Sequence, residues 1–262
     1  MAGNLLAEPT RARRIGVPLA TVAVLLVAWE LAVRLGVVPN FLLPSPTQVM
    51  AALGGDAGLL ATHAGTTIIE AALGLVIGVV VGFVAAVLMD HFETIYLAFD
   101  PLITISQTIP TVAIAPLLVL WFGYGLAPKV ILIVLTTFFP VAVSLVSGFR
   151  SVDPDMIDLM RTMGASDLQI FWQVKFPGAL EQFFSGLRIS ATYAIVGAVI
   201  SEWLGGFSGL GVYMTRVRKS FAYDRMFAVI ILISVLSLGL MKLVDLLERV
   251  SMPWNREEES DS

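Results

Sequence analysis

Six long apolar stretches run through this chain, and they constrain its fold more than any other feature. A helix needs about 20 consecutive, mostly apolar residues to cross the hydrocarbon core of a bilayer. Only 14% of the residues are charged, against about 25% in soluble domains. We therefore predict an all-α integral membrane protein with about six transmembrane helices. The predicted spans are 17–35, 63–89, 95–122, 129–149, 184–204 and 226–247.

The spans divide the chain into three parts. An N-terminal tail, 1–16, is expected in the cytoplasm, and an acidic tail, 249–262, is expected there too. Between them, 17–248 form the transmembrane domain. A charged insert at 152–182 interrupts this domain between the fourth and fifth spans.

Three arginines at 11, 13 and 14 precede the first span, as they would in a signal peptide. No small-x-small cleavage site stands before Glu30 and Arg34, so we expect a retained membrane anchor.

The Lys and Arg residues that flank the spans favour cytoplasmic termini. That orientation puts ten of the sixteen inside and six outside. The bias is modest because one outer segment is basic, so either that segment has a reason to be basic or the fifth span is misplaced. The basic residues of this segment are Arg216, Arg218, Lys219 and Arg225.

Composition excludes several kinds of site. The chain has no cysteine, which excludes disulfides, thiolate catalysis and cysteine metal sites. Its two histidines, His63 and His91, fall at opposite ends of one predicted span, so we expect no metal site. The net charge of −4 gives no basic excess for nucleic acid.

Three glycines, Gly74, Gly78 and Gly82, recur four residues apart in the second span. Residues at this spacing share one helix face, and small side chains there let helix backbones approach closely in lipid. Two interpretations stay open. The glycine face packs on another helix of the same subunit, or it packs across an interface between subunits.

Polar residues and prolines interrupt the third span. Residues 106–108 (Ser-Gln-Thr) lie at membrane depth, and Pro110 and Pro116 each remove a helix hydrogen bond. Such interruptions persist where neighbours or a water-filled cavity satisfy the freed backbone. The span is therefore either a proline-kinked helix or a helix that lines a solute path. Pro140 predicts a similar break in the fourth span.

The main acidic residues within the spans are Glu30, Glu70, Glu202 and Asp245. An ionisable group at membrane depth indicates function by default, because its desolvation is costly. The alternative is that these groups reach interfacial water, since most lie near predicted span ends. No series of acids and histidines indicates a proton relay.

Aromatic residues gather toward the predicted outer half of the spans. They form either an interfacial aromatic belt or a surface on which a flat heterocycle stacks. The candidates for lining a solute path are Glu70, Gln107, Pro110, Trp121, Tyr124, Glu202 and Trp203.

The insert carries signals for two short helices. Asp153 is a favourable N-cap, Pro154 suits the first helical position, and Gly164 is typical of the residue just past a helix end. A helix this short is marginal in water unless it packs on something. Its apolar face therefore either caps the membrane domain or docks on a partner. That face comprises Met156, Ile157, Met160 and Met163.

A second helix should follow the glycine. Ser166 and Gln169 have the spacing of a capping box, and Pro177 is expected to end the helix.

The insert resembles the signature loop of permease subunits of ATP-binding-cassette importers, which reads EAA, three residues, Gly, nine residues, then Ile-x-Leu-Pro. The segment 158–160 (Asp-Leu-Met) stands at the EAA positions, Gly164 at the glycine, and Val174, Phe176 and Pro177 at the last three. Every spacing matches, although the letters at EAA differ. The flanking PLLVLWFGYG, VDPDMIDLMRTMGAS and GLGVYM resemble the branch that handles nitrate, sulfonates, taurine, thiamine-pyrimidine precursors and riboflavin. The resemblance covers about 41–248.

The resemblance implies that the insert docks in a groove of a separate ATPase subunit, which uses ATP and Mg. None of the four lysines follows a glycine, so this chain has no P-loop and is expected to need no cofactor of its own. The resemblance also implies two ATPase copies, a second permease copy in a homodimer, an extracytoplasmic binding protein and a bacterial plasma membrane. The residues implied in coupling are Asp158, Leu159, Met160, Arg161, Gly164, Ala165, Val174, Phe176 and Pro177.

The solute is predicted less directly. The resemblance is nearest to importers of riboflavin or a thiamine-pyrimidine precursor, and nitrate, sulfonate or taurine is the alternative. A gradient-driven secondary transporter is an alternative of another class. It should show inverted repeats and ion-binding acids at the midplane, and the sequence shows neither.

Overall fold

The computed structural model describes residues 11–253, with side chains from Gly16 onward, and all regular structure in that range is helical. The predicted all-α fold is confirmed. Parts of both predicted tails lie outside the described residues, whereas α1 already begins at Arg11 and α12 ends at Ser251. The helices are α1 (Arg11–Arg34), α2 (Pro46–Gly55), α3 (Ala57–His91), α4 (Glu93–Ser106), α5 (Thr111–Phe122), α6 (Leu126–Arg150), α7 (Pro154–Thr162), α8 (Asp167–Ile170), η1 (Phe171–Lys175, a π-helix), α9 (Phe176–Gly178), α10 (Leu180–Leu204), α11 (Leu210–Lys219) and α12 (Tyr223–Ser251).

The described residues fall into two compact units. The smaller contains α1, α2 and the segment Arg216–Ile230, and the larger contains α3 to α10 with the rest of α11 and α12. In the smaller unit, Glu30 accepts hydrogen bonds from the backbone N–H and hydroxyl of Thr47, at 3.1 and 2.9 Å. These bonds hold the start of α2 on α1. Arg225, one of the predicted outer basic residues, pairs with Asp56 at 3.2 Å.

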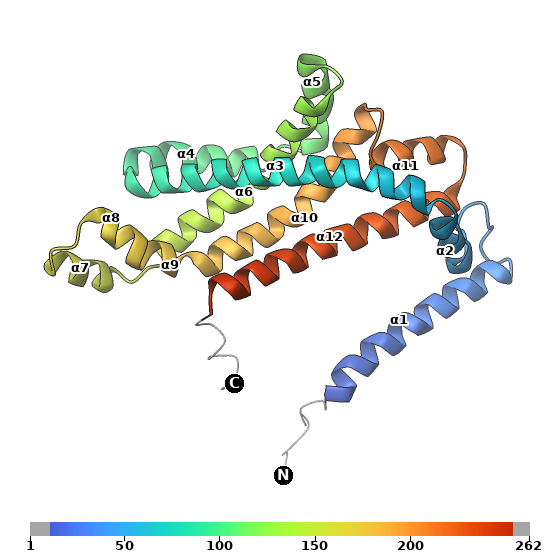
Figure 1. Cartoon of the computed structure of the whole chain (residues 1–262), viewed down its shortest axis with the longest axis horizontal. Coiled ribbons are helices and arrows are strands. Elements are labelled where there is room, and N and C mark those ends of the chain that lie inside the picture. Colours follow the sequence, from blue (N-terminus) through green and yellow to red (C-terminus); the bar gives the residue numbers. More distant parts are fainter. Residues whose placement is uncertain (1–10, 254–262) are drawn as a thin grey trace, which may run out of the picture. The chain divides into compact units, whose positions relative to one another are not determined.

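Five of the described helices, α1, α3, α6, α10 and α12, are long and apolar enough to cross a membrane. The third predicted span, 95–122, is wrong as a single helix. It is the pair α4 and α5, which bend by 99° at the break between them (Figure 1). Pro110 stands at the break as N-cap of α5, and its lack of an N–H leaves the helix no bond to continue there. With this bent pair the structure has up to six spans, as the sequence predicts. The break predicted at Pro140 is wrong, because α6 runs without interruption from Leu126 to Arg150 with Pro140 inside it.

The glycine face of α3 packs on α6 within the same chain. A Cβ on Gly74 would overlap the side chain of Ile133, and a Cβ on Gly78 would overlap that of Thr137. A Cβ on Gly82 would lie 3.0 Å from the carbonyl oxygen of Phe138. The first of the two interpretations of these glycines is therefore confirmed.

The first half of the insert folds as the sequence predicts. Asp153 caps α7 by accepting a hydrogen bond from the Asp155 N–H at 2.9 Å. Gly164 has φ +83°, the Ala165 N–H donates to the Met160 carbonyl, and the Gly164 N–H donates to that of Arg161. This is a Schellman motif, and its left-handed residue costs glycine no steric strain.

The second half of the insert contradicts one prediction. The capping box of Ser166 and Gln169 is present, but Pro177 does not end the helix. A π-helical turn precedes Pro177, and in it the Phe176 N–H donates to the Phe171 carbonyl. Pro177 then occupies the first turn of α9, where no intrahelical donor is required of it, so helical structure continues to Gly178.

Candidate functional site

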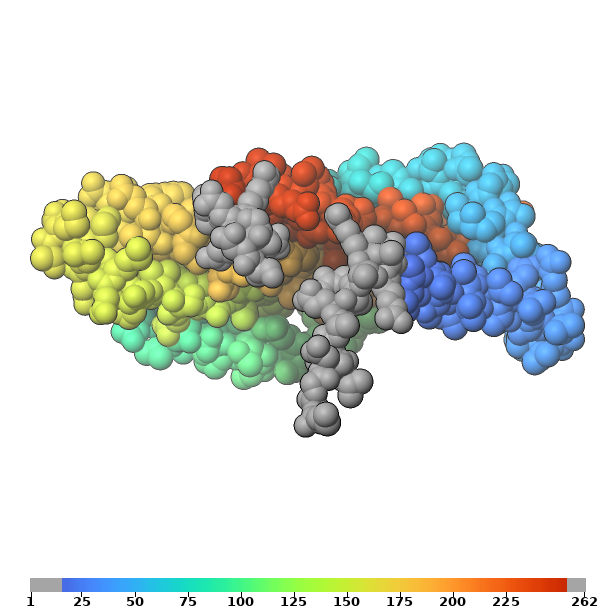
Figure 2. Space-filling model, turned by 90° about the horizontal axis from the view of Figure 1, so that it is seen from below, coloured from blue at the N-terminus to red at the C-terminus, as the bar shows by residue number. Residues whose placement is uncertain are grey.

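The tip of the insert presents apolar side chains to its surroundings. Met156 and Leu159 on α7 are 57% and 60% exposed, Met163 at its C-cap is 76% exposed, and no residue of α7 is buried. Figure 2 shows the insert at one end of the larger unit, where on the face seen no other segment of that unit covers it. An apolar helix face without cover is typical of a docking surface.

The predicted coupling residues divide between the tip and the base of the insert. Asp158 and Arg161 form an exposed ion pair at 3.4 Å on α7, beside Leu159. By contrast, the later motif residues, Val174, Phe176 and Pro177, are half-buried at the base. The motif therefore combines a free tip with an anchored base.

The base of the insert is anchored on α6 and α3. The rings of Phe149 and Phe171 lie 5.5 Å apart, and those of Phe83 and Phe176 lie 5.9 Å apart in an edge-on arrangement. Lys175 donates to both carboxylate oxygens of Asp90 at 2.9 Å. A cleft of about 680 Å³ lies between α3 and the insert around this ion pair. The Asp90–Lys175 ion pair therefore connects α3 to the insert across a cleft that other side chains do not fill.

The break between α4 and α5 opens a groove of about 350 Å³. Its lining consists of hydroxyl, amide, aromatic and proline side chains with Ile109, and no lining residue is charged. The groove is lined by Ser106, Gln107, Ile109, Pro110, Thr111, Thr136, Phe139, Pro140 and Tyr193.

Two of the seven predicted path residues, Gln107 and Pro110, lie in the groove. Trp121, Tyr124 and Trp203 do not line it, and they are exposed, by 66%, 72% and 46%. The two acids lie elsewhere, in the buried cluster described next.

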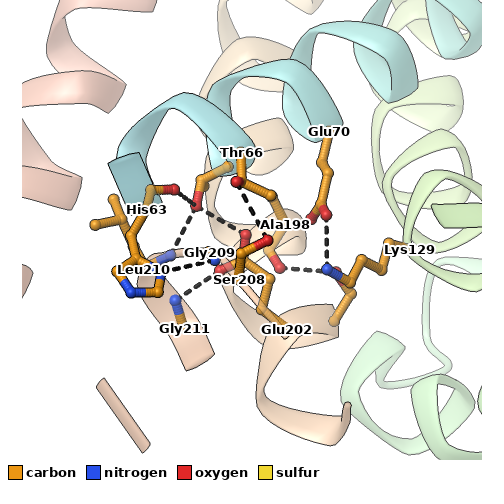
Figure 3. Close-up of polar contacts among 12 residues, drawn as sticks. His63, Thr66, Glu70, Lys129, Ala198, Glu202, Ser208, Gly209, Leu210 and Gly211 are labelled. Atoms are coloured by element: carbon orange, nitrogen blue, oxygen red, sulfur yellow. Dashed lines mark hydrogen bonds and ion pairs between the residues drawn. The ribbon is translucent and has the colours of Figure 1, made fainter. Parts of the chain in front are cut away.

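A buried polar cluster joins α3, α6, α10 and the start of α11 (Figure 3). Its ion pair joins Lys129 Nζ of α6 to Glu70 Oε1 of α3 at 2.6 Å. Both side chains are nearly inaccessible, with exposed fractions of 7% and 5%. The attraction between such groups is strong where water is absent. We call this cluster the polar cluster, and its members are His63, Thr67, Glu70, Lys129, Glu202, Gly209, Leu210 and Gly211.

Glu202 of α10 lies at the centre of the other contacts in the polar cluster, those between α3 and the start of α11. Its Oε1 lies 2.7 Å from the Thr67 hydroxyl, and its Oε2 accepts a hydrogen bond from the Gly211 N–H at 2.6 Å. The Gly209 N–H donates to His63 Nδ1 at 3.0 Å, and the Leu210 N–H donates to Thr67 Oγ1 at 2.9 Å. Side chains of α3 and α10 thus satisfy three consecutive backbone donors at the start of α11.

Close contacts with Glu202, and at Gly211 also with the backbone of Val199, require glycine at both positions. A Cβ on Gly209 would overlap the Glu202 carboxylate, and Gly209 also has φ +119°, which favours glycine. A Cβ on Gly211 would overlap the carbonyl oxygen of Val199 and would lie 2.9 Å from the Glu202 Cβ. The sequence Gly-Leu-Gly therefore makes room for a buried carboxyl group.

A family model for inner membrane components of binding-protein-dependent transport systems matches residues 74–250. The chain belongs to this family. It is the permease subunit of an ATP-binding-cassette importer, and several helices of this permease can cross a membrane. The family assignment also replaces the gradient-driven alternative.

Curated relatives place the permease in the predicted branch. It is 40% identical over 87% of its length to a probable ABC transporter permease of Haemophilus influenzae, 93% of which is covered. It is 37% identical to the formylaminopyrimidine transport permease ThiX of Halalkalibacterium halodurans, over 89% of the chain and 94% of the relative. It is 34% identical to the riboflavin transport permease RibX of Chloroflexus aurantiacus, over 92% of the chain and 90% of the relative.

Solved structures share the fold of the permease. An amino acid ABC transporter crystallised with histidines gives a TM-score of 0.63 at 20% identity, with 76% of this chain and 97% of that chain covered. The methionine transporter MetNI in an inward-facing conformation gives 0.58, with 79% and 98% covered.

The polar cluster corrects one interpretation of the sequence. Glu70 and Glu202 do not reach interfacial water, because only 4% and 1% of each residue is exposed. Glu30 and Asp245 retain more access, with side-chain exposures of 17% and 28% in their ion pairs. Lys129, the first residue of the predicted span 129–149, is also buried, at 6%.

Sequence reasoning missed the partners of the two acids, although one signal was present. His63, Thr67 and Glu70 stand at i, i+4 and i+7, so they form a polar stripe on one face of α3. Such a stripe on an otherwise apolar helix indicates a buried polar contact. Lys129 carried no local signal, because 59 residues separate it from Glu70.

Proposed function

We propose that this permease imports a small, flat heterocycle, either a thiamine-pyrimidine precursor or riboflavin. A binding protein delivers the solute, and a separate ATPase that uses ATP and Mg drives the cycle. The observation that carries the proposal is the neutral lining of the groove at the α4–α5 break.

The groove suits a flat solute with amide-like edges. Gln107, Thr111 and Thr136 offer donors and acceptors, while Phe139 and Tyr193 offer aromatic faces. Paths for anions such as nitrate or sulfonates are instead lined by Arg or Lys, and this lining contains neither. Its volume, about 350 Å³, is within the range of small-molecule sites, roughly 300–1,000 Å³.

Sequence identity supports the same choice. The named relatives that carry formylaminopyrimidine and riboflavin are 37% and 34% identical, whereas sulfonate and taurine permeases are 31% identical and a nitrate permease 26%. These identities differ little from one another, so the chemistry of the groove lining supports the proposal more strongly than they do.

The insert supports a docking role for the ATPase. Its tip offers uncovered apolar side chains, including Leu159 and Met163, and flexible methionine suits a contact that shifts during a cycle. Its base is anchored on α6 by aromatic contacts and on α3 by the Asp90–Lys175 pair. Movement of the tip would therefore be passed to the spans.

We further propose that two copies of the permease form the path between them. The groove lies on the surface of one chain, and α5 is largely exposed, so a second copy would close the path. The insert and both termini are proposed to lie in the cytoplasm, in keeping with the ten-to-six distribution of positive residues. A bacterial plasma membrane is the proposed location.

Uptake by the whole complex tests the solute. The permease would be co-expressed with the ATPase subunit and the binding protein of its transporter, and the complex would then be reconstituted in liposomes. We expect ATP-dependent uptake of labelled formylaminopyrimidine or riboflavin, and none of taurine or nitrate. Uptake of the anions in preference to both heterocycles would contradict the proposal. Tyr193→Ala should lower heterocycle uptake, while the conservative Tyr193→Phe should retain most of it.

A further inference from the structure

We propose that Glu202 holds a proton in this state of the permease. As a neutral acid it is a positioning residue that fastens Gly209–Gly211 to α3, whereas Glu70 is the ionised partner of Lys129. The two buried carboxyl groups of the polar cluster then have different tasks. This inference rests on the geometry of the cluster and does not depend on which solute is carried.

The charges of the cluster require one neutral acid. His63 Nδ1 accepts the Gly209 N–H bond, so that nitrogen carries no proton and the imidazole is neutral. The ring of Tyr213, next to His63 at 5.5 Å, is an uncharged phenol near pH 7. Among the described members of the polar cluster, Lys129 is therefore the single positive group, and it stands against two acids. A buried unbalanced charge is costly, so one acid should be protonated.

The hydrogen bonds identify that acid as Glu202. The Thr67 hydroxyl has a single hydrogen but lies 2.7 Å from Glu202 Oε1 and 3.2 Å from the His63 carbonyl oxygen. A proton on Glu202 Oε1 supplies the missing donor. Glu202 then donates to Thr67, Thr67 donates to the His63 carbonyl, and the Leu210 N–H donates to Thr67.

Glu70 is the less suitable place for the proton. Its Oε1 is 2.6 Å from Lys129 Nζ, and hydrogen bonds this short are those in which the groups are charged. Its Oε2 is buried without a hydrogen-bond partner, so a proton there would have no acceptor. A protonated Glu70 would also leave the buried ammonium of Lys129 without a counter-charge.

The difference matters for movement. A neutral carboxyl group can exchange its partners for water or for other groups without exposing a bare charge to lipid. An ion pair such as Glu70–Lys129 cannot be separated so easily in a low dielectric. The contact of Glu202 with the loop is therefore the part of the cluster that can open, and Glu70–Lys129 is the part that stays closed.

Two matched substitutions test the inference in the assembled transporter. Glu202→Gln replaces a neutral acid by an amide that can still donate to Thr67 and accept from Gly211, so uptake should stay within about threefold of wild type. Glu70→Gln removes the counter-charge of Lys129 and should lower uptake by more than about tenfold and reduce thermal stability. Glu93→Gln, at an exposed acid on α4, is the control and should change neither.

Infrared difference spectroscopy detects the protonation state of the Glu202 carboxyl group directly. The spectrum of wild type minus Glu202→Gln should contain the stretching band of a protonated carboxyl group, and that of wild type minus Glu70→Gln should contain a carboxylate band instead. Absence of the protonated band, or damage from Glu202→Gln equal to that from Glu70→Gln, would overturn the inference. Because stability and spectra need no transported solute, failure here is distinguishable from failure of the proposed function.

Discussion

The insert and the polar cluster each contain an ion pair, and they differ in almost every physical respect. The insert places Asp158 and Arg161 on its surface, where their ion pair is screened by water. The polar cluster places Glu70 and Lys129 where their side chains are 5% and 7% exposed. The insert presents a surface on which a partner can dock, whereas the polar cluster joins helices of the same chain.

The comparison shows that charge alone does not indicate a role in a membrane protein. An exposed pair contributes little to stability, so the insert can keep its polar residues for orientation and its apolar residues for contact. A buried pair is expensive to break, so the polar cluster determines which helices stay together. Substitutions should therefore separate docking from stability.

The largest effect is expected from Lys129→Met. It leaves the Glu70 carboxylate buried without its partner, and we expect about 3–5 kcal/mol of lost stability. The measurement is thermal unfolding of the purified permease in detergent. Lys242→Met is the control, because Lys242 also pairs with an acid, at 3.3 Å, but its side chain is 82% exposed. Equal losses of stability in the two variants would contradict the distinction between the buried and the exposed ion pair.

The next effect concerns the glycine face of α3. Gly78→Ala places a methyl group against Thr137 of α6, and overpacking of this kind costs about 1–3 kcal/mol. Gly65→Ala in the same helix meets nothing within 4 Å. It should be neutral or stabilise by up to about 1 kcal/mol, because alanine favours helix. Thermal unfolding of both variants checks the prediction, which fails if Gly65→Ala is the more damaging.

Gly164→Val should act on coupling more than on stability. A β-branched residue at φ +83° is strained by about 1–2 kcal/mol, and the elbow between α7 and α8 would change shape. We expect uptake to be abolished while the amount of permease in the membrane is unchanged. Gly58→Ala, in α3, meets nothing within 4 Å and is the control. Normal uptake by Gly164→Val would contradict a role of the insert in coupling ATP hydrolysis to transport.

The smallest effect on stability is expected from Met163→Ser at the tip of the insert. Because Met163 is 76% exposed, unfolding should shift by no more than about 0.5 kcal/mol. Affinity for the ATPase subunit should nevertheless fall by about fivefold or more. Pull-down or titration with the ATPase measures this, and Met163→Leu should restore the affinity. A loss of stability without a loss of affinity would show that the tip is a structural cap.

The features that the sequence predicts correctly are local ones. Asp153, Gly164 and the Ser166–Gln169 pair act within a few residues, so the caps of α7 and α8 follow from spacing alone. Pro177 was misleading because a π turn, a rare conformation, accommodates it. Pro110 indicated a break, but the 99° bend depends on how α5 packs against α6 and α10.

The site itself was only partly predictable for the same reason. Glu70 and Glu202 were visible as unusual residues, but their environment depends on contacts across 59 and 135 residues. Lys129 looked like a flanking charge because a sequence shows which residues are near a span end, not which helix faces them. Gln107 and Pro110 line the groove, and the interruption that marks them in the sequence is itself local. Their place on a solute path stays a prediction.

Accessibility of the insert tests the central claim most directly, and the absence of native cysteine makes a single-cysteine experiment clean. Leu159→Cys would be probed with a membrane-impermeant maleimide in intact cells and in inside-out vesicles, with and without the ATPase subunit. The account predicts labelling only in inside-out vesicles, and protection when the ATPase is bound. Labelling in intact cells, or a labelling rate that the ATPase does not change, would contradict it.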